Sequence, residues 1–307
     1  MSGPTASPTA SSALAQSPRS SATSALLSAA KDSAPARPSR ISAHQLHQLA
    51  SRLSDQDWRV LSFLDSSRLA SGKQLVKCLW NADRQSAPSR ARIARRVLKR
   101  LCDWRVIDAL PGRTVGGLHG GSDTLVYGVG TAGVRLLAWR NQHQKRLGTP
   151  GARYVAHTLA ATQLVVDLHA ADHEGELELI ETQQEPVCWR AFMGAMGASL
   201  MCKPDLFVRV AVPGSAYEYR WMVEVDMATE ASATIHAKTA RYLAHYRSGR
   251  EQHEHGVYPR VLWAVPDGRR AEQIEGVLRR LPTEAQRLFS VCLLDEAAGF
   301  LTREARS

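Results

Sequence analysis

Two acid-bearing, strand-like runs constrain the fold of this chain more than any other feature. The first reads Asp205-Leu-Phe-Val-Arg-Val-Ala-Val212, and the second reads Tyr219-Arg-Trp-Met-Val-Glu-Val-Asp226. Side chains alternate across a strand, so Glu224 and Asp226 leave the same face. If the two strands pair, Asp205 joins them. The sequence therefore predicts three carboxylates gathered at one end of a small sheet.

This predicted carboxylate cluster is the candidate metal site. Carboxylates held close together repel one another unless a cation binds, and ligand sets made only of oxygen suit Mg²⁺ or Mn²⁺. We therefore expect Asp205, Glu224 and Asp226 to hold Mg²⁺ (or Mn²⁺), an arrangement typical of phosphodiester hydrolysis. The alternative is that all three are strand-end acids that face water.

Length and composition narrow the class of protein. With 307 residues, the chain is long enough for two domains, and its hydrophobic content of 44% supports packed cores. No run approaches the roughly 18 consecutive apolar residues of a membrane helix. The five cysteines include no CxxC pair, which argues against a zinc knuckle or a disulfide framework. We expect a cytoplasmic protein without a membrane partner.

The net charge of +10 is unevenly distributed. Residues 1–40 carry a net charge of +3, and residues 151–307 carry −4. Residues 41–150 contain eighteen Lys and Arg against seven Asp and Glu, a net charge of +11. Because the excess is confined to one segment, we expect a DNA-binding module there, joined to a domain with a different role.

The first 40 residues differ in composition from the rest. They are rich in Ser, Ala, Pro and Thr and contain few large apolar side chains. Such a segment buries too little surface to offset its ordering entropy, so we expect a disordered arm. It lacks the continuous apolar region of a secretory signal.

Residues 41–150 are expected to form three helices followed by a hairpin. Ser54 is a helix cap followed by acids, and further helices are predicted over 69–80 and from Pro88 to Trp104. Two apolar runs, 106–110 and 124–129, flank a Gly-rich connection and predict a β-hairpin. This order is that of a winged helix-turn-helix domain, which a helix over 131–139 would close.

The third predicted helix has one basic face. Its apolar residues Ile93, Val97, Leu98 and Leu101 fall on one side, and its cations Arg92, Arg95, Arg96, Lys99 and Arg100 fall on the other. The third helix of a winged helix is the element that enters the major groove of DNA. We therefore expect these five cations to bind DNA, with Arg113 and His119 at the hairpin tip adding contacts. The alternative is a solvated charged face.

Residues 151–307 are expected to form a second domain, a sheet flanked by helices in an α/β (α+β overall) fold. An irregular stretch is expected over 191–200. Helices are predicted over 154–171, 233–247 and 269–280, and strands over 176–182, 205–212, 219–226, 260–265 and 288–294.

The acid pattern resembles a known nuclease core. Asp205 after a proline, followed by Glu-x-Asp on the next strand, is similar to the PD-(D/E)xK motif of restriction endonucleases and Holliday-junction resolvases. The span 54–295 resembles, more closely, the replication-relaxation family of plasmid and integrative-element proteins. The residues that carry this resemblance, besides the winged helix, are Lys203-Pro-Asp205, Val223-Glu-Val-Asp226, Thr229-Glu230, Lys238 and Tyr242.

This resemblance implies a restriction-endonuclease-like mixed sheet in which Asp205 and Glu224 bind Mg²⁺. The chain departs from the nuclease motif because Asp226 stands where the motif has its lysine, and an aspartate supplies no positive charge. Lys238, twelve residues later in the following helix, is the candidate replacement. The alternative is that Lys238 is a surface residue and the site is degenerate.

Two functions remain open at this point. The first is Mg²⁺-dependent DNA nicking or cleavage, with Asp205, Glu224, Asp226 and Lys238 as catalytic residues, in replication-relaxation or transfer of a plasmid or mobile element. The second is a non-catalytic DNA-binding protein, a replication accessory factor or transcriptional regulator, with a degenerate nuclease-fold scaffold. DNA is the expected partner, together with other plasmid replication or transfer proteins. No GxxxxGK[ST] motif indicates ATP-driven helicase activity.

Overall fold

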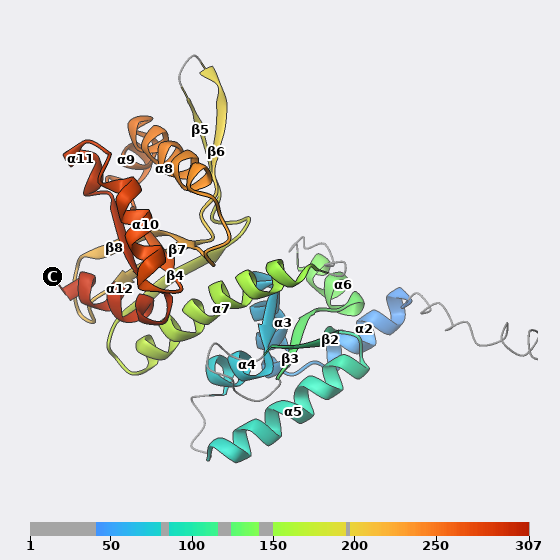
Figure 1. The fold of residues 1–307 in the computed structure, drawn as a ribbon. Helices are drawn as coiled ribbons and strands as arrows, with labels where there is room; N and C mark the ends of the chain where they lie inside the picture. The colour runs from blue at the N-terminus through green and yellow to red at the C-terminus, as the bar shows by residue number, and fades with distance from the viewer. Residues whose placement is uncertain (1–40, 81–85, 116–123, 141–149, 195–196, 307) are drawn as a thin grey trace, which may run out of the picture. The chain divides into compact units, whose positions relative to one another are not determined.

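The computed structural model describes residues 41–80, 86–115, 124–140, 150–194 and 197–306 (Figure 1). The elements below belong to one compact unit, residues 43–307. The predicted arm over 1–40 and the hairpin-tip residue His119 lie outside the described residues.

The first part of this unit contains helices and a three-stranded antiparallel sheet with the order β1-β3-β2. Its elements are α2 (Ala43–Arg52), α3 (Asp55–Ser67), β1 (Leu69–Ser71), α4 (Gly72–Leu79), α5 (Ala87–Asp103), β2 (Ile107–Val115), β3 (Thr124–Val129) and α6 (Thr131–Trp139). The helices expected after Ser54 and Pro88 and over 131–139 are confirmed, as is the hairpin.

The helix predicted over 69–80 is confirmed as α4, Gly72–Leu79, but its predicted start is wrong because Leu69–Ser71 form β1. The Ser71 side chain accepts a hydrogen bond from the backbone of Gln74, and the Gln74 side chain accepts one from the backbone of Ser71. This capping box fixes the start of α4, so Leu69–Ser71 remain extended and pair with β3. Ser54 and Asp57 form the same motif at the start of α3.

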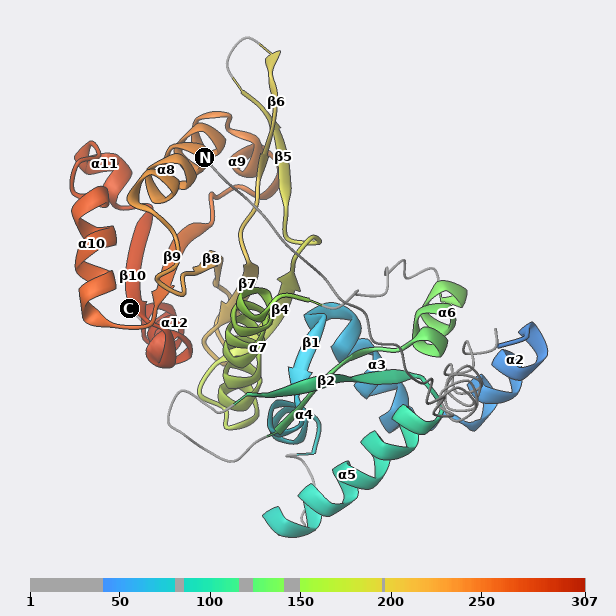
Figure 2. The same ribbon diagram turned by 45° about the vertical axis from the view of Figure 1, so that its right-hand side comes forward.

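The second part combines helices with a five-stranded mixed sheet, so the fold is of the mixed α+β class (Figures 1 and 2). In the order β10-β9-β8-β7-β4, strands β4, β7 and β8 pair antiparallel, whereas β8, β9 and β10 pair parallel. The elements are α7 (Ala152–His173), β4 (Glu178–Gln184), β5 (Arg190–Met193), β6 (Ser199–Cys202), β7 (Leu206–Ala211), β8 (Glu218–Val225), α8 (Ser232–Arg247), α9 (Arg250–His255), β9 (Arg260–Val265), α10 (Gly268–Leu278), α11 (Thr283–Gln286), β10 (Phe289–Leu293), the 3₁₀ helix η2 (Leu294–Glu296) and α12 (Ala297–Arg306).

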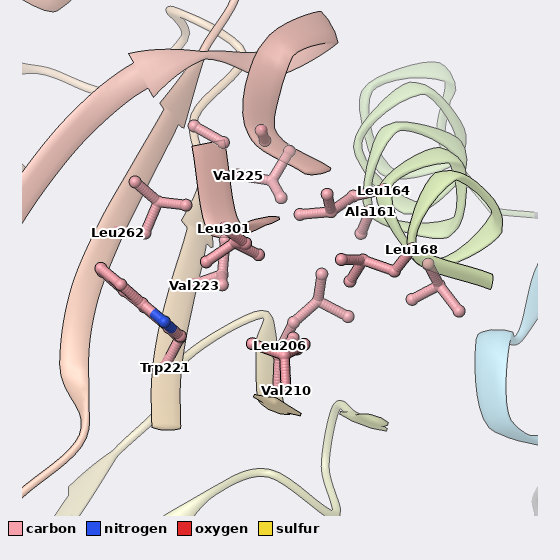
Figure 3. Packing of buried hydrophobic residues seen from close by; sticks show 14 of the residues in the cluster. Ala161, Leu164, Leu168, Leu206, Val210, Trp221, Val223, Val225, Leu262 and Leu301 are labelled. Carbon is pink, nitrogen blue, oxygen red and sulfur yellow. The ribbon is translucent and has the colours of Figure 1, made fainter. Parts of the chain in front are cut away.

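The two faces of the mixed sheet have separate cores. Val223 and Val225 of β8 pack in one cluster with side chains of α7 and α12, among them Leu164, Leu168 and Leu301 (Figure 3). On the opposite face, the buried side chains come from β8, β9, α8 and α10, and include Met222, Trp263, Tyr242 and Ile274. Alternation along β8 therefore assigns Glu224, like Met222, to the face that α8 and α10 cover.

Helix α7 also contacts the first part of the unit. The Gln74 side chain donates to the Leu159 carbonyl at 2.8 Å, and the Thr162 hydroxyl donates to the Leu69 carbonyl at 2.9 Å. Leu69, Val155 and Leu159 share a small buried cluster. The helix that begins the predicted second domain is thus packed on both sheets.

Three features differ from the sequence-based expectations. The stretch expected to be irregular forms the hairpin of β5 and β6. Short helices such as α2, and the last helix, α12, were not predicted. None of the helices within the described ranges is long and apolar enough to cross a membrane.

Candidate functional site

Asp205 and Glu224 lie opposite each other at one end of β7 and β8. Leu206 pairs with Val223, so Asp205, one residue earlier, faces Glu224. The Asp205 amide donates to the Val223 carbonyl at 3.0 Å, and the Val225 amide donates to Asp205 Oδ2 at 2.7 Å. Both side chains are buried; Asp205 is 8% exposed and Glu224 is 2% exposed. The strand register therefore produces the carboxylate pair that the sequence predicted.

Glu224 is held by two side chains of α8. Tyr242 donates from its hydroxyl to Glu224 Oε1 at 2.5 Å, and Lys238 donates from Nζ to Glu224 Oε2 at 2.8 Å. Lys238 and Tyr242 are four residues apart, so both project from one face of the helix. Lys238 also lies 2.9 Å from the Glu230 carboxylate. The lysine proposed as a replacement for the missing motif residue thus reaches the acidic pair.

The electrostatics of this cluster fix the protonation of the lysine. Burial raises the pKa of Glu224, the Asp205 carboxylate raises it further, and Lys238 and Tyr242 offset only part of that rise. Burial alone would lower the pKa of Lys238, but the carboxylates of Glu224 and Glu230 outweigh it and raise that pKa. Lys238 therefore remains a cation at neutral pH and serves as a hydrogen-bond donor.

Asp226 is not gathered with the other two acids. Arg270, at the start of α10, donates from Nη2 and Nε to the two Asp226 oxygens at 2.7 and 3.2 Å. The Ala228 amide also donates to Asp226 Oδ1. Asp226 shares its face of β8 with Glu224, and both α8 and α10 cover that face. Lys238 of α8 binds Glu224, whereas Arg270 of α10 binds Asp226. The described residues contain no group of three His, Cys, Asp or Glu side chains that could hold a metal ion.

Sequence reasoning missed two residues beside Asp205. His157 on α7 places Nε2 at 3.2 Å from Asp205 Oδ2, and this contact raises the pKa of His157. Burial raises the pKa of Glu185, which follows β4, and Asp205 adds to the rise. Both residues line a pocket next to Asp205. No local sequence pattern marks them, because only tertiary packing brings α7 and the end of β4 to this place.

The expected DNA-binding face of α5 is divided by the structure. Arg92, Arg95 and Arg96 are exposed, opposite the buried residues Ala94, Leu98 and Leu101. Lys99 pairs with Asp103 at 2.8 Å. Arg100 pairs at 2.6 Å with Asp57, a buried carboxylate, and its guanidinium lies over the Trp104 ring. Arg113 falls within β2, where the structure describes the backbone alone.

Comparison with known proteins agrees with the resemblance seen in the sequence. The model of the family described as replication-relaxation matches residues 61–261, which is more than half of the chain. No curated protein and no solved structure matches the chain. The chain therefore belongs to the replication-relaxation family.

Proposed function

We propose that this protein binds DNA through α5 and nicks or cleaves a DNA strand at the Asp205–Glu224 pair. One observation carries the proposal: Lys238 comes from α8 to bond Glu224, directly beside Asp205. In this proposal, Lys238 of α8 supplies the positive charge that the lysine of the nuclease motif would supply from the strand. Family membership indicates the setting, which is replication or transfer of a plasmid or mobile element.

The fold supports a restriction-endonuclease-like assignment for the second part. Its sheet is mixed, its two faces are covered by helices, and the candidate acids lie at one end of adjacent strands. In the first part, α3, α4 and α5 come before the β2–β3 hairpin, β1 lies between α3 and α4 and pairs with β3, and α5 leads directly into the hairpin. That arrangement supports a winged helix with α5 as the DNA-binding helix.

The donor set at the acidic pair fits a hard divalent cation. Mg²⁺ is usually held by one or two carboxylates, with water and substrate phosphates completing its shell. Asp205 and Glu224 would supply these carboxylates, and a cation would relieve the repulsion that raises the pKa of Glu224. When bound, such an ion polarises a phosphoryl oxygen and activates water. We leave Asp226 outside the ligand pair because Arg270 binds both of its oxygens.

The remaining residues have separate roles in this proposal. Lys238, a cation at neutral pH, stabilises the negative charge that develops on the phosphoryl group and does not act as a general base. Tyr242 fixes the orientation of the Glu224 carboxylate. His157 and the Val225 amide both contact Asp205 Oδ2 and orient that carboxylate.

A second function has one observation in its favour. Lys238 neutralises Glu224 and Glu230, and Arg270 neutralises Asp226, so most of the buried acids already have a cation from the chain itself. A folded state balanced in this way does not require a metal ion. This arrangement suits a non-catalytic DNA-binding protein, an accessory factor or regulator, that keeps the sheet as a scaffold.

Incubation with supercoiled plasmid and Mg²⁺ separates these functions. We expect the wild-type protein to nick or linearise the plasmid, and Asp205→Asn, Glu224→Gln and Lys238→Met to abolish cleavage. Asp167→Asn is the matched control, since Asp167 is an acid of α7 that pairs with Lys77 away from the site. Thermal unfolding provides a second readout, because a bound ion stabilises the native state by RT ln(1 + [Mg²⁺]/Kd), about 2.7 kcal/mol at a hundredfold excess over Kd. If wild type neither cleaves nor gains stability from Mg²⁺ or Mn²⁺, the scaffold function stands.

A further inference from the structure

A pocket opens beside Asp205, and it is assembled from segments far apart in the chain. The C-terminal end of α3 contributes Ser67, and the turn after it contributes Arg68. The first turns of α7 contribute Tyr154 and His157, and Glu185 follows the end of β4. We call this the Asp205 pocket. The residue at its base, Asp205, belongs to the proposed catalytic pair, so whatever fills the pocket lies next to that pair.

Arg68 has a backbone conformation that L-residues rarely adopt. Its φ of 64° and ψ of −47° lie in a region that costs on the order of 1–3 kcal/mol for a residue with a side chain. The side chain donates from Nε to the Glu185 carbonyl at 3.2 Å and from Nη1 to the Tyr154 hydroxyl at 3.4 Å. Within the described residues, Nη2 of Arg68 has no hydrogen-bond partner. A glycine would be the unstrained choice here, so the guanidinium is the reason for an arginine.

The other pocket residues leave donors toward the same space. The Tyr154 hydroxyl accepts from Arg68 and therefore has its own proton to donate. The Ser67 hydroxyl accepts from the Gln184 side-chain amide at 2.8 Å, so it also keeps its own proton to donate. One cation and two hydroxyl donors thus line the same pocket as two acids, Glu185 and Asp205. Such a set matches a ligand that offers several oxygen acceptors.

We propose that the Asp205 pocket binds a phosphate group of the DNA strand, adjacent to the phosphate that reacts at the Asp205–Glu224 pair. The proposal rests on the proposed function, which supplies DNA as the substrate. The planar fork of an arginine matches phosphate oxygens, and hydroxyls of Tyr and Ser commonly contact the DNA backbone. The residue that anchors the strand comes from the same part of the chain as α5, so DNA binding and strand positioning share one structural unit.

The charges of the pocket predict a condition for this binding. Glu185 and Asp205 offset the charge of Arg68, so the pocket alone attracts an anionic phosphate weakly. A divalent cation on the Asp205–Glu224 pair removes that opposition. We therefore expect the phosphate to bind in the presence of a divalent cation and to bind poorly without one.

Calorimetric titration with a thymidine dinucleotide, with and without a 5′-phosphate, tests the pocket in the presence of Mg²⁺. The two ligands differ only in the 5′-phosphate, so the difference between their affinities isolates the phosphate contact. For the full chain we expect the 5′-phosphate to improve affinity by about tenfold, as charge-assisted hydrogen bonds commonly do. Arg68→Gly should remove most of that preference while relieving the backbone, and Tyr154→Phe, which keeps the packing, should weaken it. Arg153→Gln, an exposed neighbour on α7, is the matched control.

The outcomes for the pocket and for the proposed function are separable. If wild type shows no preference for the 5′-phosphate, or if Arg68→Gly retains that preference, phosphate binding in the Asp205 pocket is contradicted. This conclusion holds whether or not plasmid is cleaved. If wild type prefers the 5′-phosphate, Arg68→Gly loses that preference and Tyr154→Phe weakens it, yet plasmid stays intact, the phosphate pocket is supported and the proposed cleavage activity is contradicted.

Discussion

Lys238 Nζ on α8 lies 2.8 Å from Oε2 of Glu224, a side chain only 2% exposed on β8. The two residues are 14 positions apart in sequence. Their pairing gives a buried acid a cation that does not come from its own strand. The same contact favours both a catalytic role and a self-neutralised scaffold.

The first prediction concerns the loss of this cation. Lys238→Met leaves Glu224 buried without its ion-pair partner, and such losses commonly cost several kcal/mol. We expect urea unfolding at pH 8 to show a loss of about 2–3 kcal/mol, with a smaller loss at pH 5, where Glu224 holds a proton. Lys77→Met is the matched control: its partner, Asp167, is partly exposed, so the cost should stay below about 1 kcal/mol. Equal losses of unfolding free energy in the two variants would show that the buried Lys238–Glu224 pair contributes no more to stability than the exposed pair.

The second prediction is a pH dependence of stability. Burial and Asp205 raise the pKa of Glu224 from 4.5 to about 7. Because the folded state holds this proton more tightly than the unfolded state, Glu224 favours folding below pH 4.5, and that contribution is lost as pH rises through about 7. Glu224→Gln cannot ionise, so it should gain stability relative to wild type between pH 4.5 and pH 8. A difference in unfolding free energy that does not change with pH contradicts the raised pKa.

The third prediction reverses an expectation drawn from the acid spacing. A crowded three-acid cluster would be stabilised by Asp226→Asn, whereas the structure pairs Asp226 with Arg270 in a site where both are buried. We therefore expect Asp226→Asn to destabilise the protein. Arg270→Met should cost more, about 3–5 kcal/mol, because it strands a buried carboxylate. The double variant should recover part of that loss. Additive effects in this cycle would show that the two side chains do not interact.

The fourth prediction separates DNA contacts from structural contacts on α5. Replacing Arg92, Arg95 and Arg96 together by Ala should reduce the slope of log affinity against log salt by about two to three, since each neutralised phosphate contributes about 0.9. The variant with Arg279, Arg280 and Arg287 replaced removes as many exposed cations elsewhere and serves as the control. Anisotropy titrations over a range of salt concentrations measure both slopes. If both variants give the same slope, α5 is not the DNA-binding helix.

The fifth prediction concerns Arg100, which the sequence placed on the DNA-binding face. Its guanidinium bonds Asp57, a fully buried carboxylate that also caps α3. Arg100→Gln should therefore lower the unfolding free energy by about 1–3 kcal/mol. Arg96→Gln, one turn earlier and exposed, should leave it almost unchanged. A loss of DNA affinity without a loss of stability in Arg100→Gln would return Arg100 to the DNA-contacting set.

The sequence by itself determined most of the larger elements and which of their faces are buried. The apolar runs that end at Val212 and Asp226 predicted two strands, and alternation along the second placed Glu224 and Asp226 on one face. The spacing of Leu98 and Leu101 predicted the buried side of α5. These properties depend on neighbours within a few residues, so local patterns contain them. The paired carboxylates of Asp205 and Glu224 followed from the same patterns once the strands were assumed to be adjacent.

Tertiary structure alone decided which partner each charged side chain takes. Glu224 and Asp226 share a face, yet Lys238 of α8 binds one and Arg270 of α10 binds the other. Arg100 looks in sequence like its neighbours, yet it pairs with Asp57, 43 residues earlier. Arg68 and His157 line one pocket with Asp205 only because the α3–β1 turn and α7 pack beside the start of β7. Ion pairing depends on distances and burial that helix packing sets, and a sequence pattern contains neither.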